Sequence, residues 1–253
     1  MKSETFNNSK SIIQGLKYIG NSLGRLSYSC EIDPETLFER LSIIADGAKW
    51  LIAIDKLANC QIVFTDELTL ELVEKIFDSN NVEDVVSHYY FDDDKINDLI
   101  CRCETAQQIR PYNTLFREIS EAYEQKHYQL ACIGLFALMD GVLADVSNMD
   151  VTNFTNRIKK IMDKASAQKK LGDLERKEVA VYLAIKRFEK SKELSMFYGG
   201  KFSEGESDRL KRDWLLHGRT HRDYEKIDFL KVMLWLDAII FLSNKGTERG
   251  MQP

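Results

Sequence analysis

The segment YQLACIGLFALMDGVLADVS, which begins at Tyr128, constrains the fold most because it is almost wholly apolar. A helix that is hydrophobic all round belongs at the centre of a bundle. A second apolar run, IDFLKVMLWLDAIIFLS, comes near the end of the chain. Only three prolines occur in 253 residues, and one of them is terminal. The sequence therefore predicts an all-α protein, built as a helical bundle.

Further helices are predicted before this pair. In DPETLFERLSIIADGAKWLIAIDKL, Asp33 can cap a helix with Pro34 at its first position. In TDELTLELVEKIFDSN, Thr65 or Asp66 can cap another, and FDDDKINDLICRC begins with acids that favour a helix N-terminus. The run CQIVF is β-like but too isolated to build a sheet. Two more helices are predicted over residues 151–164 and 175–197.

Pro111 marks the predicted domain boundary. We expect an N-terminal helical region of unknown role over residues 1–110, a helical bundle over residues 111–246 and a tail over residues 247–253. The alternative is that the first region extends the same bundle. The N-terminal residues lack the apolar core of a secretory signal, and no stretch approaches about 18 uninterrupted apolar residues. We therefore expect a cytoplasmic protein with no membrane association.

Five scattered cysteines are an odd number, which favours reduced thiols. Cys101 and Cys103 could contribute to a zinc site, but no second ligand pair has matching spacing. No metal and no cofactor are predicted.

The net charge of −5 hides an asymmetry between the two parts of the chain. Residues 1–109 hold 10 Lys and Arg against 19 Asp and Glu, whereas the remainder holds 25 against 21. Such asymmetry is typical of a protein with a polyanion partner, because lysine and arginine neutralise phosphates. The alternative is that the basic helices are solvated faces.

The segment RDWLLHGRTHRDYEK, residues 212–226, carries the candidate chemistry. Metal-free cleavage of a phosphodiester needs a group that moves protons near neutral pH and a cation that stabilises the charged transition state. The imidazole of His217 suits the first role and the guanidinium of Arg212 suits the second. Five residues of regular helix turn through about 140°, so one copy cannot easily aim both groups at one phosphate. Either the helix bends near Gly218 or two chains pool their motifs.

RDWLLHG, with helices before it and an apolar helix after it, resembles the signature of the HEPN superfamily, R-x(4–6)-H with a polar residue commonly after the arginine. The resemblance covers residues 112–246. Through LLHGRTHRDY and the upstream FALMDGVLADV it is similar in particular to a bacterial branch associated with phage defence and abortive infection. A toxin-like role in such a system is one expectation.

The resemblance implies a metal-independent endoribonuclease that acts as a homodimer with its motifs facing each other. The motif positions fall on Arg212, Asp213 and His217. The implied reaction is attack of the RNA 2′-hydroxyl on the adjacent phosphate, which leaves cyclic-phosphate and 5′-hydroxyl ends and spares DNA. RNA is then the main partner, with a regulatory or antitoxin protein as a further one.

The neighbouring residues have both functional and structural interpretations. Arg219, Arg222, Tyr224 and His221 could contact RNA through phosphate pairing and base stacking, or they could simply be exposed. Asp140 could orient Arg212, or it could face water at the helix end.

Structural interpretations also exist for the motif itself. His217 could be a helix-end histidine, and Arg212 could pair with Asp208 or Asp213. His217 and His221 have the spacing of a helical metal pair, but the clustered arginines repel a cation. Trp214 and Trp235 are predicted in the core or an interface. The rival function is therefore a non-catalytic helical module that binds RNA or protein.

Overall fold

The computed structural model describes residues 34–63, 69–148, 156–158, 160–161, 181, 196–197 and 202–247, and within them every regular element is a helix. This confirms the predicted all-α class. In chain order, the described helices include α2 (Pro34–Asn59), α3 (Leu70–Asp78), α4 (Val82–Ser87), the π-helix η1 (His88–Asp92), α5 (Lys95–Thr105), the 3-10 helix η2 (Arg110–Tyr112), α6 (Asn113–Glu124), α7 (Tyr128–Ser147), the 3-10 helix η4 (Phe202–Glu204), α10 (Arg212–Leu216) and α11 (Lys226–Thr247).

The chain divides into two compact units, Met1–Ala53 and Ile54–Pro253, so the division falls inside α2. The predicted boundary at residue 110 lies within the second unit. The reason is that α5, which precedes this position, packs against both α6 and α11. All elements of the candidate site belong to the second unit.

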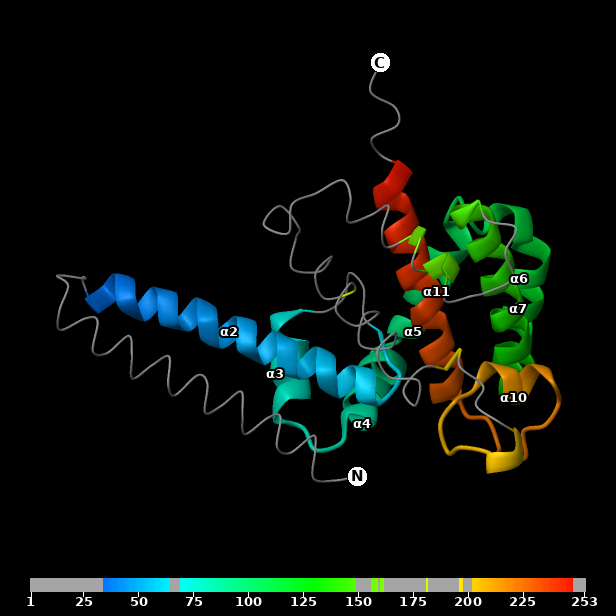
Figure 1. Cartoon of the computed structure of the whole chain (residues 1–253), viewed down its shortest axis with the longest axis horizontal. Coiled ribbons are helices and arrows are strands. Elements are labelled where there is room, and N and C mark those ends of the chain that lie inside the picture. Colours follow the sequence, from blue (N-terminus) through cyan, green and yellow to red (C-terminus); the bar gives the residue numbers. More distant parts are fainter. Residues whose placement is uncertain are drawn as a thin grey trace, which may run out of the picture. The chain divides into compact units, whose positions relative to one another are not determined.

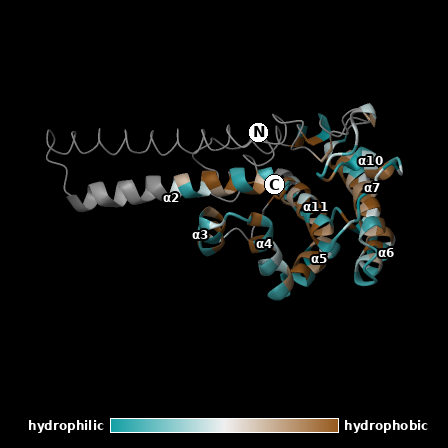
Figure 2. Ribbon diagram, turned by 90° about the horizontal axis from the view of Figure 1, so that it is seen from below, coloured by the Kyte–Doolittle hydropathy of each residue, from teal (hydrophilic) through white to brown (hydrophobic). Residues whose placement is uncertain are grey.

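The centre of the second unit is formed by α7 and α11, as their apolar sequences predict. They pack against each other, and α6 packs along α7 after the short connection of residues 125–127 (Figure 1). Apolar colouring is prominent along α11 in Figure 2, and its residues from Phe229 to Ile240 are all buried. Trp235 is among them, at 1% exposure, which confirms its predicted core position.

Among the described helices, α7 alone has the length and apolar composition to cross a bilayer, and half of its most apolar window is buried within the protein. A helix at the centre of a bundle has the same composition. Two carboxylates, Asp140 and Asp145, interrupt its sequence.

The close approach of α6 and η2 to α7 depends on two glycines. A β-carbon at Gly134 would lie 2.5 Å from Cγ1 of Ile119, and one at Gly141 would lie 2.8 Å from the hydroxyl of Tyr112. That hydroxyl also donates a 2.8 Å hydrogen bond to Asp145. Any side chain at these glycines would push the neighbouring helix away from α7.

Polar side chains tie the smaller helices to α11. Arg102 of α5 donates from Nε at 3.0 Å and from a terminal nitrogen at 3.1 Å to the buried carboxylate of Asp237. Lys231, itself buried, pairs with Glu83 of α4 at 2.7 Å. Both partners of each pair are far apart in the sequence, so the acidic N-terminal half of the chain contributes directly to the burial of α11.

Some predicted helix boundaries need correction or lie outside the described residues. Helix α3 begins at Leu70 and is capped by Thr69, whose hydroxyl accepts from the amide of Leu72 at 3.2 Å. It does not begin at Thr65 or Asp66, and those two residues are outside the described part, as is the proposed cap Asp33. Most of the two helices predicted over 151–164 and 175–197 also lies outside it.

Candidate functional site

The predicted motif lies on α10, a five-residue helix that is separate from α11. Its first amide, that of Arg212, donates a 2.7 Å hydrogen bond to the carbonyl of Met196. Trp214 and Leu215 are buried beneath it. Burial of Trp214 at 7% exposure confirms its predicted core position. The motif is therefore a short helix fastened to the bundle by its own apolar side chains.

The end of α10 is set by Gly218. Its φ of +64° is a left-handed conformation that glycine adopts without strain. The amide of Arg219 donates to the carbonyl of Trp214 at 2.9 Å, and that of Gly218 donates to Leu215 at 3.1 Å. These two bonds form a Schellman motif, which satisfies the last carbonyls of the helix. The chain consequently turns away just after His217.

The guanidinium of Arg212 lies between two carboxylates. One terminal nitrogen contacts Asp140 of α7, and the other donates to Asp213 at 3.0 Å. The three side chains are 22%, 30% and 36% exposed respectively. Arg212 thus connects α10 to α7 through Asp140. Of the sequence-based alternatives, the pair with Asp213 is present, and Asp208 uses its carbonyl to accept from Arg222 instead.

His217 faces a different neighbour. It is exposed at the end of α10, and its ring packs edge-on against Phe202 of η4, with 5.8 Å between ring centroids. Phe202 also packs edge-on against Trp214, at 5.2 Å between centroids. The exposed Arg219 lies over the Phe202 ring, with its guanidinium carbon 4.3 Å from the centroid.

Arg212 and His217 therefore point to different surroundings within one chain. The arginine is turned toward α7 and the histidine toward η4, as expected for positions about 140° apart around a helix. The chain turns at Gly218, which follows both residues, so this turn does not change how Arg212 and His217 are placed relative to each other. Asp213 stays beside Arg212.

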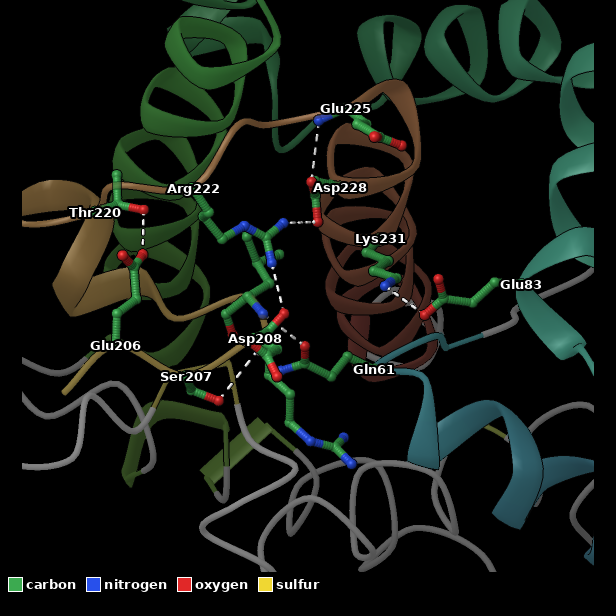
Figure 3. A network of polar contacts seen from close by, with 12 residues as sticks. Gln61, Glu83, Glu206, Ser207, Asp208, Thr220, Arg222, Glu225, Asp228 and Lys231 are labelled. Carbon is green, nitrogen blue, oxygen red and sulfur yellow. Dashed lines mark hydrogen bonds and ion pairs between the residues drawn. The ribbon is translucent and has the colours of Figure 1, made fainter. Parts of the chain in front are cut away.

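The loop after α10, residues 217–225, is held by the segment that precedes it; we call it the motif loop. The carboxylate of Glu206 accepts from the hydroxyl of Thr220 and, at 2.7 Å, from the amide of His221 (Figure 3). The preceding segment is itself attached to the residues after α2. The amide group of Gln61 both donates to the carbonyl of Leu210 and accepts from its amide, each at 2.9 Å.

Arg222 and Tyr224, two of the predicted RNA contacts, make contacts within the fold. The guanidinium of Arg222 pairs with the buried Asp228 of α11 and donates to the carbonyl of Asp208 at 2.8 Å (Figure 3). It also lies 4.7 Å from the centroid of the Tyr224 ring. Tyr224 is only 9% exposed, and burial raises its pKa to about 12. A buried ring covered by a guanidinium is not available to stack on a base.

Of the other two predicted RNA contacts, Arg219 and His221 are exposed. Because α10 ends at Leu216, His217 and His221 do not share a helix, so their spacing is not that of a helical metal pair. Within the described residues, no group of three or more histidine, cysteine or acidic side chains could hold a metal ion. Cys101 is exposed, whereas Cys103 is buried beside Asp237.

Two residues of the site were missed in the sequence, Phe202 and Glu206. Both lie in the glycine-containing stretch YGGKFSEGES that precedes the motif. Phe202 stands between glycines and Glu206 directly follows one, both outside any apolar period, which was a signal that this stretch contacts another part of the chain. The residues they contact could not have been identified from spacing alone.

The comparisons of this chain with known proteins add no relative. Neither the family models, nor the curated proteins, nor the solved structures include one that matches it.

Proposed function

We propose that the protein is a metal-independent endoribonuclease of the HEPN type, active as a homodimer in the cytoplasm and serving in bacterial phage defence or a toxin system. The observation that carries the proposal is the exposed imidazole of His217 at the end of a short, well-anchored helix that also bears Arg212 and Asp213. An imidazole at the surface can reach a polymeric substrate, whereas a buried one could not.

In the proposed reaction His217 removes the proton from an RNA 2′-hydroxyl. The 2′-oxygen forms a bond to the adjacent phosphorus, and the bond from phosphorus to the 5′-oxygen breaks. The leaving 5′-oxygen takes this proton back from the protonated His217, and the products carry a 2′,3′-cyclic phosphate and a 5′-hydroxyl. General acid–base catalysis of this kind contributes about 10²- to 10⁴-fold to a rate.

Arg212 stabilises the charge that develops on the phosphate oxygens in this proposal. Its contacts with Asp140 and Asp213 hold the guanidinium group in place. Since Arg212 and His217 of one chain face different neighbours, a common phosphate requires the arginine of one copy and the histidine of the other. Two-fold symmetry would supply two such pairs.

The second candidate is a non-catalytic helical module that binds RNA or protein. The observation that favours it is that Arg212 already contacts two carboxylates, which offset its charge. In that case the motif serves to dock α10 on α7, and only the exposed cations of the motif loop meet the partner. RNA binding without cleavage, with an affinity that falls steeply as salt rises, is its signature.

The test is incubation of the purified full chain with single-stranded and structured RNA in EDTA, beside His217→Ala and Arg212→Ala. Matched controls are His88→Ala, an exposed histidine of η1, and Arg117→Ala, an exposed arginine of α6. The proposal expects cleavage by the wild type and both controls, and its loss in the two motif variants. Cleavage by all five proteins would remove the catalytic assignment, and RNA binding without cleavage by any would favour the second candidate.

A further inference from the structure

The ring of Phe202 is the meeting point of the exposed groups of the site. It packs against the imidazole of His217 in a T-shaped arrangement, the guanidinium of Arg219 lies over its face, and it is backed by the buried Trp214. We propose that Phe202 is a positioning residue that holds Arg219 and His217 as one phosphate-binding unit. This inference rests on the proposed function for the nature of the ligand, an RNA phosphodiester.

The geometry supports a single unit. The Arg219 guanidinium carbon is 4.3 Å and the His217 ring centroid 5.8 Å from the Phe202 centroid. Since both distances are measured from one ring, the two groups lie no more than about 10 Å apart. Both residues are exposed and both follow the last turn of α10. An anion at this surface therefore meets a cation and an imidazole from the same chain.

Within the described part of the chain, Arg219 differs from the other two arginines of the motif, which both pair with carboxylates. Arg212 pairs with Asp140 and Asp213, and Arg222 pairs with Asp228. Within the described part of the chain, no carboxylate pairs with Arg219. Its guanidinium instead stacks on an aromatic face, which orients the fork but leaves its charge uncompensated.

Backbone hydrogen bonds also hold Arg219 in its position beside Phe202. The Schellman motif at Gly218 places the amide of Arg219 on the carbonyl of Trp214, so the residue cannot shift along the helix. Glu206 holds the next two residues of the motif loop. The backbone of Arg219 is therefore restrained by its hydrogen bond to α10, and its side chain is restrained by Phe202. A preorganised cation loses less freedom when it binds a phosphate.

The test measures binding of a single-stranded 2′-O-methyl RNA, which cannot undergo 2′-hydroxyl attack, by fluorescence anisotropy over a range of salt concentrations. The variants are Arg219→Gln, Phe202→Leu and Phe202→Trp, with Arg117→Gln as the exposed control. Arg219→Gln should weaken binding about tenfold, as expected for a lost charge-assisted contact. It should also reduce the slope of log affinity against log salt by about 0.7, the value for one single-strand phosphate contact.

Phe202→Leu keeps an apolar side chain but removes the ring face. It should weaken binding about two- to fivefold through the lost cation–π contact, with an unchanged salt slope because the charge remains. Phe202→Trp, which offers a stronger face, should restore the wild-type affinity. A purely structural role for Phe202 does not predict this rescue, so failure of the tryptophan variant to bind better than the leucine variant would overturn the inference.

The inference and the proposed function fail in different ways. If Arg219→Gln binds like Arg117→Gln while the wild type cleaves unmodified RNA, the phosphate-binding unit is wrong and the nuclease assignment stands. If the wild type cleaves nothing but Arg219→Gln and Phe202→Leu bind more weakly as described, the unit stands and the nuclease assignment is wrong.

Discussion

Arg212, at the start of α10, contacts Asp140, which lies 72 positions earlier in the middle of α7. This pair joins the short helix α10 to the central helix α7 of the bundle. It also determines the direction of the motif arginine, which leaves His217 to face η4. The position of the candidate catalytic groups thus follows from one ion pair at partly buried side chains.

Loss of this pair should destabilise the protein. Arg212→Ala and Asp140→Ala are each expected to lower the free energy of unfolding by about 1.5 kcal/mol, the lower end of the range for a hydrogen bond to a charged group, because both side chains are partly exposed. Arg212→Lys should recover only part of it, because one ammonium cannot reproduce a fork that reaches two carboxylates with different nitrogens. Urea denaturation of the two single variants and the double variant gives the coupling energy. A coupling near zero would mean that the contact does not hold α10 on α7.

Gly218, the glycine of the motif, should be sensitive to substitution. Its φ of +64° disfavours a β-carbon by about 1 kcal/mol, although a β-carbon there would meet no atom within 4 Å. Gly218→Ala should therefore be destabilising and Gly218→Asn less so, because asparagine tolerates this conformation. Gly47→Ala in α2 is the matched control, since it also meets nothing within 4 Å and its φ is not positive. Alanine there should stabilise the helix, and equal effects at both glycines would contradict the Schellman assignment.

Glu206 should protect the motif loop from proteolysis. Its carboxylate holds Thr220 and His221, which lie between two tryptic sites, Arg219 and Arg222. Glu206→Ala removes hydrogen bonds worth about 1 kcal/mol in total, so the loop should open about fivefold more often. Peptide mapping of limited trypsin digests measures the rates at these two sites. Glu118→Ala, at an exposed position of α6, should leave them unchanged.

Burial of Tyr224 should make stability depend on alkaline pH. Its pKa is about 12 in the folded protein, against about 10 for an ordinary phenol, so the folded state holds the proton more tightly. The resulting stabilisation is complete below pH 10 and is lost as the pH rises toward 12. Tyr224→Phe cannot ionise, so its unfolding free energy should fall less over that window. Parallel curves for the two proteins between pH 10 and pH 12 would show that the phenol is not protected.

The parts of the fold that follow from local pattern were predictable from the sequence. The apolar runs of α7 and α11 have no polar face, so burial at the centre of a bundle is their only stable arrangement. The different directions of the Arg212 and His217 side chains were also predictable, because helical geometry alone separates positions five residues apart. The neighbours of the two side chains, Asp140 for Arg212 and Phe202 for His217, could not be predicted.

Contacts between distant segments could not be inferred from spacing. Gln61 meets Leu210 across 149 positions, and Arg102 meets Asp237 across 135. Many polar side chains of the sequence could form such a hydrogen bond equally well, and tertiary packing determines which of them meet. The same reason explains why the surroundings of Tyr224 could not be inferred, since nothing in the local sequence distinguishes an aromatic ring that packs against an ion pair from one that stacks on RNA.

The most direct test of the central claim is cleavage of an RNA oligonucleotide that carries a single 2′-deoxy substitution at the mapped cleavage position, with the ends identified by mass spectrometry. We predict that the unmodified RNA yields a 2′,3′-cyclic phosphate and a 5′-hydroxyl in EDTA, that the one substitution abolishes cleavage at that position, and that His217→Ala gives no product with either RNA. Cleavage that persists at the 2′-deoxy position, or that is unchanged in His217→Ala, would contradict the account.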